Sequence, residues 1–373
     1  MAKGQIPYVP EGFFGVHTDR YTMNSPRIVA REFSRMQKLG IRRIRTTILW
    51  QMAQFWFSPA LEDAQAEDAM IDFMRPDLVI GTAARCGIEV MPTIWGTPWW
   101  SATSRFPGEK TEPLTIVGGV PRDPADLGTF MRACVRRYGP GGYFWKANPD
   151  IPYLPVRWWQ PWNEPDRPAF MRQPFDAGKF AAILRSAYEG VKAVDPGATV
   201  VLSGLGPVCA ESEDLFEKVY SGGVKGWFDV AAIHPFPKEP SEVIDALRLN
   251  RRVMERHGDG DKPIMLSQTT WTSALGQTRM EEPPPSTVTE EMQARNLREL
   301  MHLVAAHRHE LNLAGLLYHG WSSPDREPQL PNSPDSFLWS GLHRVEAGAV
   351  FVEKPAFTAF KEAIAALQSP DAA

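Results

Sequence analysis

Residues 156–203 decide the fold, because they contain a strand, a helix and a second strand in direct succession. The apolar run VRWWQPW (156–162) is followed by DAGKFAAILRSAYEGVKAV (176–194), where apolar residues recur at helical spacing. The turn DPGA (195–198) ends the helix and leads into TVVLS (199–203). Strand, helix and strand in this order predict parallel pairing through a right-handed crossover.

The same alternation runs through the rest of the chain, and no low-complexity linker interrupts it. We expect further strands at 13–17, 43–50, 88–95, 228–234, 262–270 and 314–318. Further helices are expected at 26–39, 70–86, 126–138, 212–220, 241–256, 289–307 and 356–367. Eight strand–helix pairs are the number that closes a barrel, so the predicted fold is α/β, a single (β/α)8 TIM barrel over residues 1–373. Functional residues should lie at the C-terminal ends of its strands.

Composition and charge exclude several classes of partner. The 40 Lys and Arg residues are scattered, and with 44 Asp and Glu they give a net charge of −4, so no nucleic acid partner is expected. No segment approaches the roughly 18 apolar residues of a membrane span, so no membrane partner is expected either. Residues 1–14 lack the apolar core of a signal peptide, which predicts a cytoplasmic protein, or a secreted one whose signal peptide has been removed. The sequence indicates no particular oligomeric state.

Cysteine and histidine spacing argues against metal and cofactor sites. Cys86, Cys134 and Cys209 are odd in number and show no C-x-x-C spacing, so neither a disulfide framework nor a zinc site is expected. His302, His307 and His309 do not fall on one helical face. No G-x-G-x-x-G follows a strand, so no dinucleotide site is expected.

The fourth predicted strand ends in the most specific motif of the chain, RWWQPWNEP (157–165). Pro165 stops the strand and leaves Glu164 at the rim, while Asn163 can offer its amide to a substrate hydroxyl. A carboxyl group held among Trp side chains should have a pKa raised by desolvation, which suits a general acid near neutral pH. The structural alternative is a carboxylate that merely caps the next turn.

With this motif the chain resembles the clan A retaining glycoside hydrolases, and family 39 with its bacterial exopolysaccharide-hydrolase relatives is the most similar group. In that clan an Asn-Glu at the end of strand four supplies the acid/base, and a Glu at the end of strand seven is the nucleophile. The resemblance covers nearly the whole chain. It implies a (β/α)8 barrel that hydrolyses an oligosaccharide, polysaccharide or glycoside with retention and needs no metal or organic cofactor.

The resemblance also assigns supporting residues. Arg45, in GIRRIRTTILW (40–50), holds the place of an Arg beneath the nucleophile, although it could simply pair with any interior acid. His234, in HPF (234–236), would contact the nucleophile, the acid/base or a sugar hydroxyl, unless it is structural; Phe236 stands where a Tyr is often found. The remaining expected substrate-binding residues are the hydroxyl donor His17 and the sugar platforms Trp95, Trp99 and Trp321. For any one of the 13 Trp residues, core packing remains the alternative.

The strand-seven segment KPIMLSQTTW (262–271) departs from the pattern, because Gln268 matches the nucleophilic Glu. Retaining hydrolysis needs two carboxyl groups about 5–5.5 Å apart, and a neutral amide cannot attack the anomeric carbon as a carboxylate does. The chain as written should therefore be nearly inert.

Three explanations of Gln268 remain open. The first is an engineered, nearly isosteric Glu-to-Gln replacement in a normal enzyme. The second is a natural, non-catalytic barrel that binds glycans. The third is an active enzyme that uses assistance from the substrate or another carboxylate, for which Asp19 and Asp166 are the candidates. The long loops at 97–122 and 276–287 are expected to decide whether the cleft accepts chain ends or interior linkages.

Overall fold

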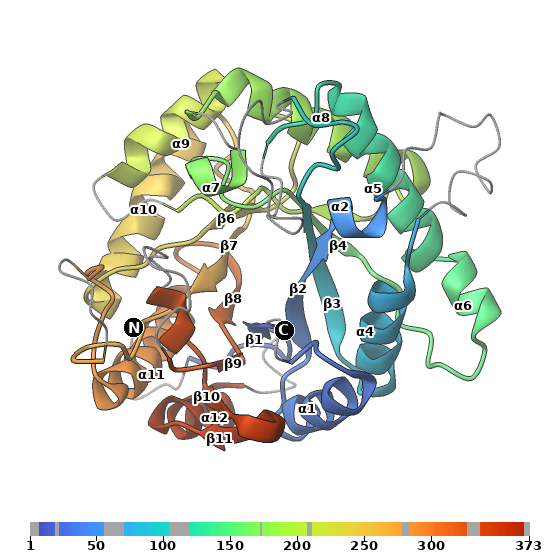
Figure 1. Ribbon diagram of the computed structural model, residues 1–373. Helices are drawn as coiled ribbons and strands as arrows, with labels where there is room; N and C mark the ends of the chain where they lie inside the picture. The colour runs from blue at the N-terminus through green and yellow to red at the C-terminus, as the bar shows by residue number, and fades with distance from the viewer. Residues whose placement is uncertain are drawn as a thin grey trace, which may run out of the picture.

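Eight strands of this chain form one parallel sheet ringed by helices. A computed structural model describes residues 7–18, 22–55, 71–103, 119–171, 174–206, 211–277, 283–326 and 336–368 (Figure 1). The strands of the main sheet are β1 (Phe14–His17), β2 (Arg43–Leu49), β3 (Glu89–Trp95), β4 (Trp158–Pro161), β5 (Thr199–Val200), β6 (Ala231–Ile233), β7 (Ile264–Thr269) and β8 (Leu313–His319).

The order of the strands is that of a closed barrel. Along the ladder the order is β5-β4-β3-β2-β1-β8-β7-β6, and each neighbouring pair is parallel. The remaining gap, between β5 and β6, is bridged just beyond β5 by the pairs Val201 with Val230 and Leu205 with Ile233. The predicted TIM-barrel-like α/β fold is therefore confirmed.

The outer ring consists of the helices that follow the strands. They are α1 (Pro26–Lys38), α4 (Met74–Arg85), α5 (Pro124–Tyr138), α8 (Ala177–Val194), α9 (Glu211–Ser221), α10 (Pro240–Arg256), α11 (Glu290–His307) and α12 (Pro355–Leu367). Side-chain oxygens of Ser25, Asp123, Asp176 and Thr289 accept backbone N–H groups at the starts of four of them. These N-caps explain why the helix boundaries were readable from sequence.

Inside the barrel, an apolar layer of side chains lies below a polar layer, which is at the C-terminal ends of the strands. A small apolar cluster meets across the interior, and its members are Met91, Val201, Val230, Ala232, Met265 and Leu317. Side chains two residues apart on a strand point to the same face. Two residues further on from five of these lie Thr93, Ser203, His234, Ser267 and His319, all buried or nearly so. The polar layer at the C-terminal ends of the strands is thus set by alternation.

Several short elements were not predicted. They are α2 (Trp50–Ala53), α6 (Tyr143–Ala147), α7 (Pro168–Met171) and, between β8 and α12, the strands β9 (Ser322–Ser323), β10 (His343–Glu346) and β11 (Val350–Glu353) with the 3-10 turns η1 (Ser336–Trp339) and η2 (Ala347–Ala349). Strands β10 and β11 pair in antiparallel fashion, and each is only four residues long. Such strands are too short for sequence periodicity to reveal. The helix expected from residue 70 begins at Met74. Within the described ranges, no helix has the length and apolar character needed to span a membrane.

Candidate active site

Glu164 lies at a tightly fixed turn after β4. The Trp162 N–H donates to the Ile94 carbonyl at 2.7 Å, and the Glu164 N–H donates to the Gly204 carbonyl at 3.1 Å. Trp162 and Glu164 have φ of 67° and 39°, in the left-handed region that non-glycine residues seldom adopt. Backbone held in this region by its surroundings is typical of functional sites.

The Glu164 carboxyl group is almost entirely buried, with 7% of the residue exposed. Burial raises its pKa to about 7, against the opposing influence of Arg167 and Arg45. Its Oε1 lies 2.8 Å from Nδ1 of His234, so of the contacts considered for His234 the one with Glu164 is present. A carboxyl group that exchanges its proton near pH 7 can serve as acid and then as base.

His234 fits its place only because residue 204 is a glycine. A Cβ atom on Gly204 would lie 1.9 Å from Nε2 of His234. Burial, with Arg45 and Arg167, holds the pKa of His234 well below its ordinary value, so the imidazole is neutral. The contact between His234 and Glu164 is therefore a hydrogen bond rather than an ion pair.

Arg45 lies at the centre of the site and is fully buried. Its guanidinium donates to three amide oxygens, those of Gln160 at 2.6 Å, Asn163 at 2.6 Å and Gln268 at 2.9 Å. Burial lowers the pKa of Arg45 to about 9, while Glu164 acts in the opposite direction. The expected pairing of Arg45 with position 268 is present, and its partner there is a neutral amide.

A directed chain of hydrogen bonds connects Arg45 to Glu164. Arginine can only donate, so Oε1 of Gln160 accepts and its Nε2 donates to Ser267 Oγ at 3.0 Å. The Ser267 hydroxyl is then free to donate to His234 Nε2 at 2.8 Å. When the Ser267 hydroxyl donates to Nε2 in this way, His234 carries its proton on Nδ1 and donates it to Glu164 at 2.8 Å.

An irregularity in β7 brings two consecutive side chains into this site. The β7–β8 register shifts between Leu266 and Thr269, which breaks strict alternation. Ser267 consequently contacts Gln160 and His234, while the next residue, Gln268, reaches Arg45.

His17 and His319 complete the polar layer. Their Nδ1 atoms lie 2.9 Å apart, and Nδ1 of His17 lies 3.3 Å from Arg45. Burial and the neighbouring Arg45 hold the pKa of both rings low, to about 3 for His319, so both are neutral. His319 was missed because the expected strand stopped at 318, and Ser267 and Gly204 were missed because no motif marks them. Gln160 stands in RWWQPWNEP (157–165), but no role was assigned to it.

The three Trp residues that were expected to stack on sugars differ in their exposure. Trp321 is fully buried, and its indole N–H donates to Glu32 at 2.8 Å. The expectation that Trp321 stacks on a sugar is therefore wrong, because its ring is buried in the core and hydrogen-bonded to Glu32 on α1. Trp99 is 44% exposed, and Trp95 at the end of β3 is half-buried against the Phe170 ring.

The alternative second carboxylate Asp166 is close to Glu164 in sequence but already has partners. Both of its oxygens lie 3.3 Å from the Gly206 N–H, and Arg167 lies 3.6 Å away. Burial and Glu164 raise the pKa of Asp166 to about 6. Asp19 lies outside the described residues. Within the part of the chain that the structure describes, no His, Cys, Asp and Glu side chains gather into a metal-binding group.

Comparison with solved structures shows the fold. A β-xylosidase from Caulobacter crescentus matches 95% of this chain and 68% of its own at 15% identity and a TM-score of 0.63. A family 39 glycoside hydrolase from Bacteroides cellulosilyticus matches 96% and 64% at 16% identity and a TM-score of 0.60. A family 5 mannosidase from Rhizomucor miehei matches 98% and 94% at 16% identity and a TM-score of 0.55.

The chain thus spans about two thirds of the length of the first two of these structures. No model of a protein family matches the sequence, and neither does any curated protein. The chain is similar in structure to the clan A glycoside hydrolases and shares their TIM-barrel-like fold.

Proposed function

We propose that this barrel is a retaining glycoside hydrolase in which Glu164 is the acid/base and position 268 is the nucleophile position. The observation that carries the proposal is the placement of Gln268 on Arg45, connected by hydrogen bonds through Gln160, Ser267 and His234 to a buried Glu164 whose pKa is about 7. An arginine beside position 268 would keep a carboxylate there ionised, as a nucleophile requires.

Each residue would have a defined step when position 268 is a Glu. The protonated Glu164 gives its proton to the leaving oxygen while the carboxylate at 268 attacks the anomeric carbon. The ionised Glu164 then removes a proton from the water that releases the sugar, and the hydrogen bond from His234 stabilises this ionised state. With Gln268 the first step has no nucleophile, so the chain binds a glycoside without turnover.

The substrate class is a glycoside or oligosaccharide of common pyranose or furanose sugars. Its range is suggested by similar structures described as a β-xylosidase, a glucosidase, an exo-β-1,4-mannosidase and an α-L-arabinofuranosidase. No metal or organic cofactor enters the proposed reaction.

The test is the Gln268→Glu variant, assayed with 4-nitrophenyl β-xyloside, β-glucoside, β-mannoside and α-arabinofuranoside. Hydrolysis of at least one of them should rise by about a thousandfold or more over the unaltered chain. The matched control is Gln160→Glu, which also places a carboxyl group beside Arg45 but away from position 268. Equal activity of both variants, or none in Gln268→Glu, would contradict the proposal.

One observation favours a second candidate, a barrel that binds glycans and does not cleave them. The Arg45 guanidinium already donates to three amide oxygens and lies 3.3 Å from Nδ1 of His17, so four of its five N–H groups have partners while residue 268 is a neutral amide. Glycan binding by the unaltered chain, together with no hydrolysis by Gln268→Glu, would select this candidate.

A further inference from the structure

One aromatic side chain beside the site is both exposed and in contact with site residues. Phe337, in η1, is 36% exposed. Its ring centroid lies 5.3 Å from that of His319 and 5.1 Å from that of Phe236. His319 belongs to the polar layer at the strand ends, and Phe236 follows His234 by two residues. Phe337 therefore connects the ends of β6 and β8 at the rim of the site.

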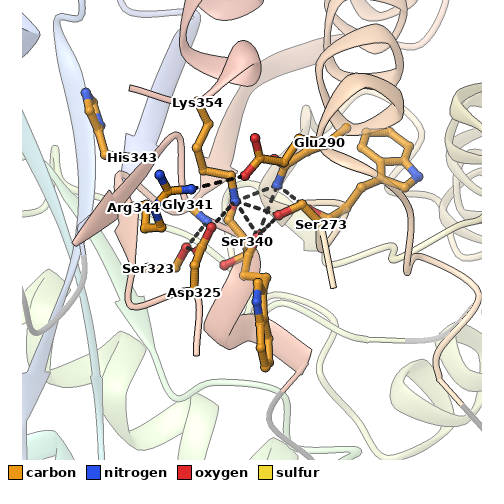
Figure 2. A network of polar contacts seen from close by, with 12 residues as sticks. Ser273, Glu290, Ser323, Asp325, Ser340, Gly341, His343, Arg344 and Lys354 are labelled. Atoms are coloured by element: carbon orange, nitrogen blue, oxygen red, sulfur yellow. Dashed lines mark hydrogen bonds and ion pairs between the residues drawn. The ribbon is translucent and has the colours of Figure 1, made fainter. Parts of the chain in front are cut away.

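The backbone around Phe337 is held by hydrogen bonds from several elements. The Asp325 N–H donates to the Leu338 carbonyl at 2.8 Å, and Ser340 Oγ donates to the Phe337 carbonyl at 2.8 Å. The Trp339 carbonyl accepts from Lys354 Nζ at 3.0 Å. Figure 2 shows Asp325, Ser340 and Lys354 close together in one network of polar contacts.

The centre of this network is a buried ion pair between Lys354 and Asp325. Their side chains are 1% and 5% exposed, and Nζ lies 2.9 Å from the Asp325 carboxylate. The same ammonium donates to Ser273 Oγ at 2.7 Å, and Ser323 donates to the other Asp325 oxygen at 2.5 Å (Figure 2). These contacts tie β9, η1 and the segment after β7 to the start of α12, so the turn that carries Phe337 is fixed before any ligand arrives.

An exposed ring that is already immobilised suits the recognition of a sugar. Aromatic rings pack well against the apolar C–H face of a pyranose, and a fixed turn loses little further entropy on binding. Phe236, 8% exposed, leaves the neighbouring position without a hydrogen-bond donor. Among the described residues, Phe236 and Phe337 thus add an apolar edge beside the polar His319.

We propose that Phe337 contacts the substrate directly and determines specificity, by packing on the apolar face of a pyranose unit bound at the β6–β8 side of the site. The inference rests on the proposed function, because it takes the ligand to be a glycan. It predicts a preference for neutral sugars over those that carry a charged group on the face toward Phe337.

The experiment is isothermal titration of the unaltered chain, Phe337→Ala and Phe337→Trp with xylobiose, cellobiose and β-1,4-mannobiose. At least one disaccharide should bind, Phe337→Ala should weaken its Kd by about tenfold, and Phe337→Trp should stay within about threefold. Tyr8→Ala is the matched control, since Tyr8 is a 46% exposed ring beside Val9, which pairs with Gln368 away from the site, and its Kd should not change.

The outcomes separate the two proposals. Equal affinity of the unaltered chain and Phe337→Ala would overturn the role of Phe337 and leave the proposed function in place. If no disaccharide binds and Gln268→Glu hydrolyses none of the aryl glycosides, the proposed function falls and this inference with it. A Phe337→Ala variant whose unfolding midpoint matches that of the unaltered chain shows that a loss of affinity comes from a lost contact.

Discussion

Replacement of Lys354 with methionine should be strongly destabilising. The change removes the cation that neutralises Asp325, whose side chain is only 5% exposed, and takes donors from Ser273 and the Trp339 carbonyl. Removing one partner of a buried ion pair leaves an uncompensated charge, and such changes cost about 3–5 kcal/mol. We therefore expect the free energy of unfolding of Lys354→Met to fall by that amount.

The assay is urea unfolding followed by circular dichroism at 222 nm, with two comparison variants. Asp325→Asn in the Lys354→Met background removes the stranded charge, and Asn tolerates the left-handed backbone at this position, where φ is 44°. The double variant should recover a large part of the loss. Lys179→Met breaks an exposed pair with Asp176 at 3.7 Å and should cost less than about 1 kcal/mol.

Two results would refute this reasoning. One is a cost below about 1 kcal/mol for Lys354→Met, which would mean that water reaches the pair as it reaches a surface salt bridge. The other is a double variant as unstable as Lys354→Met, which would show that the lost hydrogen bonds, and not the stranded charge, dominate.

Three further outcomes follow from the site. The pKa of Glu164 is raised by burial from 4.5 to about 7, so its contribution to stability is complete below pH 4.5 and is lost as the pH rises through 7. Between pH 5 and pH 8 the unfolding free energy of the unaltered chain should therefore fall by up to about 3 kcal/mol more than that of Glu164→Gln in urea titrations. Parallel curves for the two proteins would contradict this. Gly204→Ala should cost about 1–3 kcal/mol, because its Cβ would lie 1.9 Å from His234 Nε2; an unchanged urea midpoint would count against the close contact. Ser267→Ala in the Gln268→Glu background should move the basic limb of the kcat/KM profile to higher pH by up to about one unit, because His234 loses the donor that fixes its tautomer, and an unmoved limb would argue against the hydrogen-bond chain.

The barrel could be predicted because its signals are local. The helices show apolar spacing along their own length, and four of them also have a side-chain N-cap, as α8 does at Asp176. The small sheet β9–β11 gives no such signal, because its strands are only two to four residues long. Contacts of Lys354, such as that with the Trp339 carbonyl, hold the segments around it together. Its position depends on segments far apart in sequence.

The site was predictable where a motif marks it. Glu164 and Asn163 stand in a specific motif, and Gln268 was found by its match to the family pattern. Strand alternation alone would not have placed both Ser267 and Gln268 in the site, because it turns one of two consecutive side chains away from the interior. The β7 irregularity that lets both face inward comes from pairing with β8. Trp321 was assigned wrongly because an indole suits both core and sugar, and the decisive partner, Glu32, is 289 residues away.

The most direct test of the central claim is covalent labelling of Gln268→Glu with a 2-deoxy-2-fluoro glycosyl fluoride of the sugar that it hydrolyses. The fluorine slows release of the glycosyl-enzyme, so the attacking residue keeps the sugar and can be located by peptide mass spectrometry. We expect one sugar per chain, attached at position 268. A label on Asp166 or elsewhere, or continued hydrolysis with no label at all, would contradict the assignment of position 268 as the nucleophile.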